Sequence, residues 1–166
     1  MNIITSKDNE IIKNIKKLKE KKYRNKENKY IIEGLKLIEE AINENMDIDK
    51  IVICEDCMSE ENLNSKLLYE IAKYDCIYVS EKVFSTLTDV MVPQGILAVI
   101  NKKSNIKDIN YSEELIIILD GIQDPGNFGT ILRTIDSANL KQVIVTNKTV
   151  DAYNPKVIRS TMGATF

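Results

Sequence analysis

The stretch LDGIQDPGNFGTILRTIDSAN, residues 119–139, carries the features from which the fold can be predicted. It follows ELIIIL at 114–119, an apolar run that predicts a strand. Its second half, GTILRTIDSA at 129–138, spaces Ile131, Ile135 and Ala138 along one face of a predicted helix. QVIVTN at 142–147 predicts the next strand. A strand, loop, helix and strand in this order indicate a β–α–β unit with parallel strands.

The loop between the first strand and the helix is the candidate site. It places Asn127 and Gly129 at the carboxyl edge of a parallel sheet, where open α/β folds bind ligands. Backbone N–H groups at a helix start can hold an anion, and the guanidinium of Arg133 can bind a phosphate. The alternative is purely structural: Asn127 caps the helix, Gly126 turns the chain and Arg133 is a solvated surface side chain.

Known nucleotide-binding loops do not fit this spacing. A Walker A loop requires Gly-Lys-Ser/Thr at its end, but Asn127 and Phe128 follow Gly126. The dinucleotide fingerprint requires G-x-G-x-x-G, of which only Gly126 and Gly129 are present. These mismatches argue against a small-nucleotide-binding domain, which we keep as a third hypothesis.

The chain before residue 102 predicts a separate α/β domain. We expect a basic amphipathic helix at 8–22, a polar turn, and then alternating strands and helices that form a mostly parallel sheet covered on both faces. The predicted strands are 30–32, 50–54, 76–80 and 95–101, and the predicted helices begin near Leu35 and cover 62–74, with Leu63 on the apolar face, and 81–88. The predicted boundaries are 1–103 for this domain, 104–112 for a linker and 113–166 for the second domain.

Charge is distributed unevenly along the chain. Residues 7–29 hold ten Lys or Arg and four Asp or Glu, a local net charge of +6, so the remainder carries −8 because the whole chain carries −2. A basic segment on an acidic body suggests a surface that binds a polyanion. A solvated amphipathic helix is the alternative.

Three cysteines and no histidine limit the chemistry. Cys54 and Cys57 form a C-x-x-C pair, but a structural zinc site needs four ligands and only Cys76 remains. We therefore expect reduced thiols and no metal site. Without histidine, proton transfer must use other groups. No apolar run is long enough to span a membrane and the first residues lack the pattern of a signal peptide, so we expect a cytoplasmic protein.

Several segments, in order, resemble one family. DPGNFGTILRTIDSAN resembles the first signature of the SpoU/TrmH-type (SPOUT superfamily) RNA 2′-O-ribose methyltransferases, whose core is N-x-G-x-x-x-R. VDAYNPKVIRSTMGATF resembles the segment that follows it. YRNKENKYIIEGLKLIEEAI and VPQGILAVI resemble the substrate-binding domain of the ribosomal-RNA branch.

This resemblance implies a fold, an activity and partners. It implies a three-layer RNA-binding domain similar to a ribosomal-protein fold, followed by the first part of an α/β-knot methyltransferase domain. It implies S-adenosylmethionine as the cofactor, a ribose 2′-hydroxyl in ribosomal RNA as the acceptor, and a homodimer.

The resemblance also assigns residues. Asn127 and Arg133 match the catalytic positions, with Arg133 acting either as the base or as a phosphate ligand. The expected RNA contacts are Arg24, Tyr30, Lys22, Lys26 and Gly129. Glu33 and Gly34 complete the family's R…Y-x-x-E-G pattern, and for these two residues a structural strand-to-helix turn is the alternative to an RNA contact. A structural turn is also expected of Gly126.

One departure from the family is large. The Gly-x-Glu and Ser-Leu-Asn signatures, which in the family form the knot and the cofactor pocket, are absent from residues 1–166. We therefore assign no cofactor-binding residue, and expect these residues alone to be inactive and to expose strand edges that favour self-association. The alternative from another class is a stand-alone RNA-binding module without catalysis.

Overall fold

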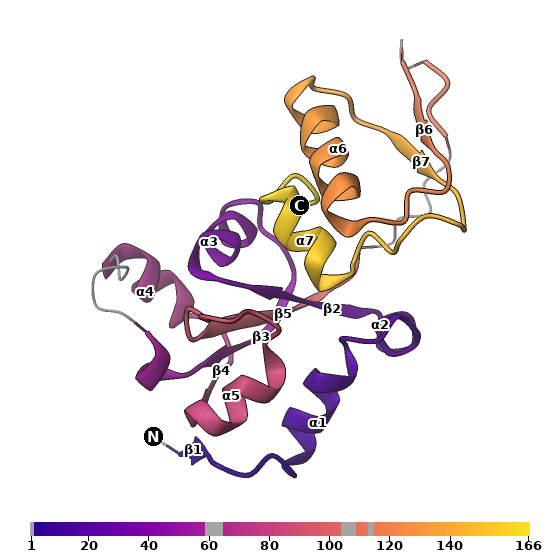
Figure 1. Ribbon diagram of the computed structural model, residues 1–166. Coiled ribbons are helices and arrows are strands. Elements are labelled where there is room, and N and C mark those ends of the chain that lie inside the picture. Colours follow the sequence, from indigo (N-terminus) through magenta and orange to yellow (C-terminus); the bar gives the residue numbers. More distant parts are fainter. Residues whose placement is uncertain (1, 59–64, 104–108, 113–114) are drawn as a thin grey trace. The chain divides into compact units, whose positions relative to one another are not determined.

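A computed structural model describes residues 2–58, 65–103, 109–112 and 115–166 (Figure 1). The chain divides into two compact units, residues 1–102 and residues 103–165. Each unit is an arrangement of helices on a sheet, which confirms the predicted α/β class. Residues 104–108 of the predicted linker, and Leu63 of the predicted helix 62–74, lie outside the described residues.

The N-terminal unit is built on one five-stranded sheet in the order β1-β4-β3-β5-β2. The strands are β1 (Ile3–Ile4), β2 (Lys29–Glu33), β3 (Ile48–Ile53), β4 (Cys76–Val79) and β5 (Ile96–Asn101). β4 is parallel to β1 and β3, whereas β5 is antiparallel to both β3 and β2. The expectation of a mostly parallel sheet therefore holds for one half of it only.

The reversal at β5 has a local cause. The chain leaves the carboxyl end of β4, forms α5 (Glu81–Leu87) and returns through residues 88–95 to the carboxyl end of β3, which lies beside that of β4. There the N–H of Cys54 donates to the carbonyl of Gly95 at 2.7 Å, so β5 starts where β3 ends and runs in the opposite direction.

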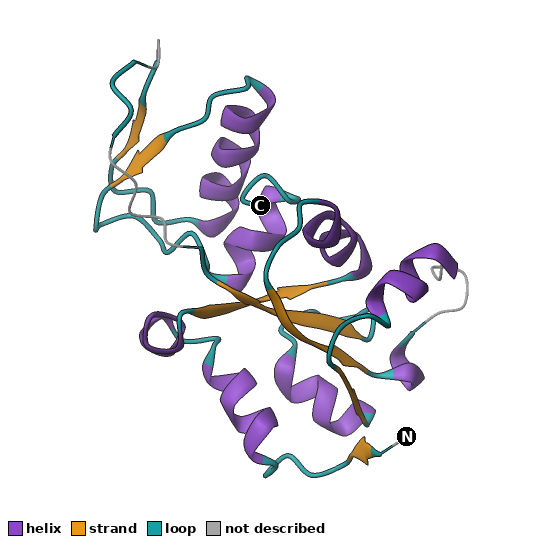
Figure 2. Cartoon of the chain, turned by 180° about the vertical axis from the view of Figure 1, so that it is seen from behind, coloured by secondary structure: helices purple, strands orange, loops and turns teal. Residues whose placement is uncertain are grey.

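Helices cover both faces of this sheet, which gives three layers (Figures 1 and 2). On one face, α1 (Glu10–Lys17) and α5 share a core with the sheet. That core consists of Ile12, Ile15 and Leu18 from α1 and its C-cap, Val83, Phe84 and Leu87 from α5, Ile31, Val52, Val79, Leu97 and Val99 from the strands, and Cys54 directly after β3. The other face is covered by α3 (Leu35–Asn43) and α4 (Ser65–Ile71). Because both faces are covered, residues 96–100 of β5 are all buried.

The predicted helix at 8–22 is wrong in its extent. The side chain of Asn9 caps α1 by accepting from the N–H of Ile11 at 2.9 Å, and α1 ends at Lys17. A second helix, α2 (Lys21–Glu27), then occupies the segment that we predicted as a polar turn. The break between them is stabilised by Arg24, whose Nη1 donates to the carbonyls of Leu18 and Lys19 at 3.0 and 2.7 Å. These are carbonyls that the end of α1 leaves without helical partners.

The C-terminal unit pairs two short parallel strands, β6 (Ile117–Leu119) and β7 (Val143–Val145), with Leu119 opposite Val145. The crossover is α6 (Pro125–Ser137), and α7 (Pro155–Thr161) follows β7. The core of the unit contains Leu119, Phe128, Leu132, Ile135 and Val157. Both predicted strands, 114–119 and 142–147, are two or more residues longer than β6 and β7. The predicted helix begins at Gly129, four residues after the start of α6, and α7 was not predicted.

Candidate functional site

The loop after β6 is shaped by Asp124, which the sequence analysis did not single out. Asp124 is the N-cap of α6, and its Oδ1 accepts from the N–H of Asn127 at 2.7 Å. Pro125 occupies the first helical position, which requires no N–H donor. Asn127 is therefore not the cap, as the structural alternative held, but an exposed residue in the first turn. The chain turns at Gly121, with φ 71°, and not at Gly126, whose φ is not positive.

Residues of the segment after β7 form hydrogen bonds to this loop and to the end of β6. The hydroxyl of Thr146 donates to Oδ1 of Asp120 at 2.6 Å, and the N–H of Val150 donates to the carbonyl of Ile122 at 2.8 Å. The buried Thr149 accepts at Oγ1 from the N–H of Ile122 and donates to the carbonyl of Leu119, both at 3.3 Å. Asn127 thus lies in a first helical turn that Asp124 caps, beside a loop that the segment after β7 holds at the carboxyl end of β6.

An open pocket of about 440 Å³ lies beside this loop. Its lining consists of Gly121, Ile122, Gln123, Asp124, Asn127, Thr130 and Ile131. All of these come from one stretch of chain, so the pocket has a wall on one side only. The amides of Gln123 and Asn127 and the hydroxyl of Thr130 can position a polar ligand there, but they cannot enclose one.

The two predicted catalytic residues lie on different sides of α6. Six residues separate Asn127 from Arg133, which places them about 9 Å apart along the axis and about 120° apart around it. Asn127 lines the pocket and Arg133 does not. Arg133 is exposed, and no ion pair to it is formed within the described part of the chain. The structure therefore brings Asn127, Gln123 and Thr130 together and leaves Arg133 outside this group.

Gly129 is a packing residue, which corrects its predicted role as an RNA contact. It is buried where α6 crosses α7. A Cβ at this position would lie 2.3 Å from Cβ of Ser160 and 3.0 Å from the carbonyl oxygen of Val157. The glycine is needed because only a residue without a side chain allows this approach of the two helices.

Two predicted RNA contacts in the N-terminal unit are buried. Arg24 is 2% exposed and its guanidinium is directed at the carbonyls of Leu18 and Lys19, while Tyr30 on β2 is 1% exposed. A side chain with this little exposed surface has no room for a phosphate. In this structure both side chains therefore act in the packing of the unit.

Glu33 and Gly34 occupy a strand-to-helix turn. Oε1 of Glu33 accepts from the hydroxyl of Thr88 at 2.5 Å, which ties β2 to the loop after α5. Gly34 has φ 104°, a conformation that side chains disfavour, and the next N–H, that of Leu35, donates to Oε1 of Gln94 at 3.0 Å. This geometry agrees with the structural role that was the alternative for both residues.

Lys22 and Lys26 are the predicted RNA contacts that do lie at the surface. Both extend from α2, and their side chains are 69% and 75% exposed. A hydrogen bond to Glu20 raises the pKa of Lys22 above its ordinary value, so it stays charged. Lys26 lies 3.8 Å from Glu27, at the limit of an ion pair.

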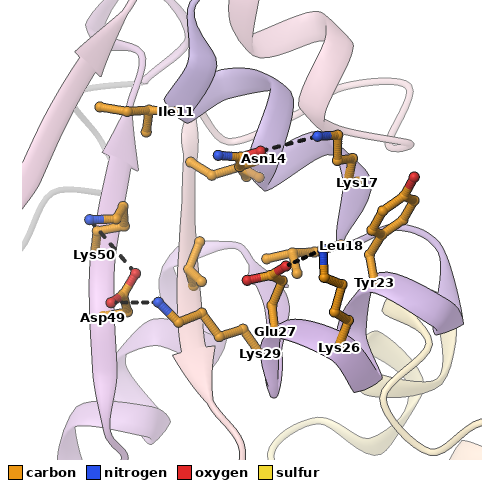
Figure 3. A pocket seen from close by; sticks show the side chains of 12 residues that line it. Ile11, Asn14, Lys17, Leu18, Tyr23, Lys26, Glu27, Lys29, Asp49 and Lys50 are labelled. Carbon is orange, nitrogen blue, oxygen red and sulfur yellow. Dashed lines mark hydrogen bonds and ion pairs between the residues drawn. The ribbon is translucent and has the colours of Figure 1, made fainter.

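Next to these lysines is a pocket of about 330 Å³ that the sequence analysis missed (Figure 3). It lies between α1, α2 and the strands β2, β3 and β5, and its rim includes Tyr23, Lys17 and Lys26. The signal for it was present in KKYRNK at 21–26, because an aromatic residue within a run of basic residues is a pattern of nucleic-acid-binding surfaces.

The C-x-x-C pair lies at the end of β3 and in the short 3₁₀ helix η1 (Glu55–Cys57). The two sulfurs are 3.0 Å apart, with the Cys54 thiol donating to Sγ of Cys57. Burial, with the neighbouring Cys54 as a second cause, raises the pKa of Cys57 to about 12. Burial also raises the pKa of Cys76. Thiols with raised pKa values are poor nucleophiles at neutral pH, and in the described ranges no group of His, Cys, Asp or Glu is arranged to hold a metal.

None of the described helices is both long and apolar enough to cross a bilayer.

Two protein-family models match the chain, one for each unit. Residues 9–98 match the MRM3-like substrate binding domain, and residues 114–166 match the SpoU rRNA Methylase family. Together they account for most of the chain.

Curated relatives and solved structures give the same result. The chain is 34% identical over its whole length to the 23S rRNA (guanosine(2553)-2′-O)-methyltransferase RlmP of Bacillus subtilis, of which it covers 63%. It is 31% identical to the human mitochondrial rRNA methyltransferase 3 over 90% of its length, covering 36% of that protein. An AdoMet-bound rRNA methyltransferase from Sinorhizobium meliloti superposes with a TM-score of 0.80 at 30% identity, with 98% of this chain and 61% of that chain covered. The chain thus spans less than two thirds of the length of these relatives.

Proposed function

Because the chain belongs to the SpoU rRNA methylase family, with an MRM3-like substrate-binding domain ahead of the methylase segment, we propose that it serves methyl transfer from S-adenosylmethionine to a ribose 2′-hydroxyl of ribosomal RNA. The observation that carries the proposal is the loop at the carboxyl end of β6, where Asn127, which matches the family's catalytic position, follows the Asp124 cap and the loop is bonded to the segment after β7. A protein that only binds RNA has no need of this arrangement.

The N-terminal unit is proposed as the RNA-binding domain, with residues 1–103 as its extent, 104–112 as a linker and 113–166 as the start of the methyltransferase domain. Its support is the basic surface of α1 and α2. Lys22 and Lys26 are expected to contact phosphates, and single substitutions to Ala should each lower the salt dependence of binding to single-stranded RNA by a slope of about 0.7.

The catalytic roles follow from the chemistry of the transfer. A sulfonium methyl group is already activated, so the protein must align the ribose hydroxyl and assist the loss of its proton. We assign alignment to Asn127, whose side chain borders the pocket with Gln123 and Thr130. Arg133, exposed on another side of α6, is assigned to the phosphate next to the reacting ribose, since a planar guanidinium suits that contact and is normally protonated.

The residues beside the loop do not by themselves make a cofactor site. The pocket has one wall, and in the family the Gly-x-Glu and Ser-Leu-Asn segments that bind the cofactor follow the part that residues 114–166 match. Residues 1–166 alone are therefore expected to bind RNA without transferring methyl groups. We further propose a cytoplasmic homodimer, for which the exposed apolar side chains of Leu115 and Ile118 offer a surface to cover.

A chimera tests the proposal. Residues 1–166 are joined to the part of Bacillus subtilis RlmP that follows the segment this chain matches, and transfer from labelled S-adenosylmethionine to ribosomal RNA is measured. We expect 2′-O-methylation, lowered about 10²- to 10³-fold by Asn127→Ala and by Arg133→Ala but unchanged by Lys156→Ala, an exposed lysine on α7. A chimera that binds RNA and leaves it unmethylated, while intact RlmP is active, would support the stand-alone RNA-binding module instead.

The role of Arg133 is separated from general-base catalysis by Arg133→Lys. A phosphate ligand should be replaced in part by lysine, with the pH–rate profile unchanged. A profile shifted by this substitution would contradict phosphate binding and favour proton abstraction by Arg133.

A further inference from the structure

The pocket between α1 and α2 combines an aromatic wall, an apolar floor and a basic rim (Figure 3). Tyr23 and Lys26 rise from α2 on one side, and Lys50 borders it from β3 on the other. Leu18 and Val99 lie at its base, and both are buried in the core below. A volume of about 330 Å³ is within the range of small-ligand sites.

The charges around the pocket favour an anion at its rim. Lys29 and Lys50 are held by Asp49, at 2.8 and 3.7 Å, and Lys50 also by Asp75 at 3.0 Å. Nζ of Lys17 donates to the neutral Oδ1 of Asn14 at 3.2 Å, and Lys26 lies 3.8 Å from Glu27. Of the four lysines that line the pocket, Lys17 and Lys26 are therefore the cations most easily drawn to an incoming phosphate.

Tyr23 lines the pocket, and two lysines approach its ring. Nζ of Lys22 stands 4.7 Å from the ring centroid and Nζ of Lys17 stands 5.8 Å from it, and of these two lysines only Lys17 lines the pocket. A cation–π contact at 5.8 Å is close to the limit at which such contacts count. A planar group entering the pocket can therefore displace Lys17 from the ring at little cost.

We propose that this pocket holds one unpaired base of the RNA, stacked on Tyr23, with the flanking phosphates bound by Lys17 and Lys26. Bases splayed out of single-stranded loops and stacked on aromatic side chains are the usual means by which proteins read RNA. The inference rests on the proposed function, since it names the element of RNA that the N-terminal unit binds. An acidic peptide would use the lysines but would leave the ring and the apolar floor without a counterpart.

Arg24 positions this pocket without touching its occupant. Its Nη1 holds the carbonyls of Leu18 and Lys19, and so fixes the turn that sets α2, with its neighbour Tyr23, against the end of α1. This gives the buried arginine a part in RNA binding that does not require it to reach the RNA.

Two RNAs and one matched control test the proposal. Anisotropy titrations use the 166-residue chain with a hairpin that carries 2-aminopurine in an unpaired loop, and with the same stem closed into a full duplex. Tyr23→Leu should weaken binding of the hairpin about 5- to 100-fold and abolish quenching of 2-aminopurine, while duplex binding changes less than twofold. Tyr23→Phe should retain both. Tyr69→Leu is the control, because Tyr69 on α4 is exposed and has Lys73 at the same 4.7 Å from its ring.

The outcomes separate this inference from the proposed function. If the chain binds both RNAs and Tyr23→Leu, folded by circular dichroism, binds the hairpin as tightly as wild type, the stacking pocket is refuted and RNA binding stands. An equal loss for hairpin and duplex would also refute it, because it would show a general charge or packing effect. If wild type binds neither RNA, the proposed function of the N-terminal unit fails. Displacement of the hairpin by polyglutamate as readily as by unlabelled RNA would assign the pocket to acidic peptides.

Discussion

The contact at Gly129 makes the sharpest prediction about stability. Gly129→Ala adds a Cβ that would lie 2.3 Å from Cβ of Ser160, 2.9 Å from its carbonyl carbon and 3.0 Å from the carbonyl oxygen of Val157. Two of these three atoms belong to the backbone of α7, so the clash is not relieved by turning a side chain. The helices must separate, and overpacking of this kind costs about 1–3 kcal/mol.

The net effect is smaller because alanine is the better helix former. Replacing glycine inside a helix gains up to about 1 kcal/mol, so we expect a net loss of about 1–2 kcal/mol in the free energy of unfolding of the C-terminal unit. Hydrogen exchange of the whole chain, followed by mass spectrometry, measures this locally. Amides of α6 and α7 should exchange about 5- to 30-fold faster, while those of β5 in the other unit serve as an internal control.

A second variant tests whether the contact with Ser160 causes the loss of stability. Ser160→Gly removes the nearest of the three atoms, so the double variant Gly129→Ala/Ser160→Gly should lose less than the two single variants together. If Gly129→Ala alone leaves exchange in α6 and α7 unchanged or slower, the helices do not meet as described and the packing role of Gly129 is wrong.

Two further predictions concern the N-terminal unit. Arg24→Met keeps the length of a buried side chain but removes the donor from the buried carbonyl of Leu18 and the partly buried carbonyl of Lys19, so the urea midpoint should fall by an amount equivalent to about 2–4 kcal/mol; a variant as stable as wild type would contradict the positioning role. The pKa of Cys57 is raised from 9.0 to about 12 in the folded protein. The contribution of the Cys57 thiol to the free energy of unfolding should therefore be complete below pH 9 and be lost as the pH rises toward 12, because the thiol ionises first in the unfolded chain. Cys57→Ala should flatten that decline in urea titrations at pH 8 to 11, and an equally steep decline in the variant would assign it to other groups.

Local signals predicted much of the fold. The predicted strand at 95–101 is close to β5, because a strand buried on both faces appears in the sequence as a continuous apolar run. The predicted helix near Leu35 is close to α3, because a helix buried on one face shows apolar residues at helical spacing. The loop at 120–124 was found because turn residues follow a strand there. The N-cap of α6, Asp124, was not identified, although Pro125 directly after it is typical of the first helical position. Asn127 was considered as the cap instead, because Asn is as suitable an N-cap residue as Asp.

The errors lie where distant contacts decide. The break after Lys17 depends on one guanidinium reaching back to two carbonyls, and apolar spacing carries no sign of it. Gly129 meets a residue 31 positions later, so its role could not be told from that of a ligand-binding glycine. The direction of β5 depends on where residues 88–95 bring the chain back, which the sequence of the strand itself does not encode.

The place of β5 between β3 and β2 has a consequence for how the chain folds during synthesis. β5 is the last strand of the N-terminal unit to leave the ribosome, yet it lies between β3 and β2 and is the sole partner of β2 in the described sheet, with Ile31 opposite Val99. Until it arrives, the apolar residues of β2 have no strand to pair with, and pairings this far apart in sequence form slowly. We therefore expect the unit to remain unfolded until about residue 101 has emerged, and then to fold as a whole, with its basic surface appearing only at that moment.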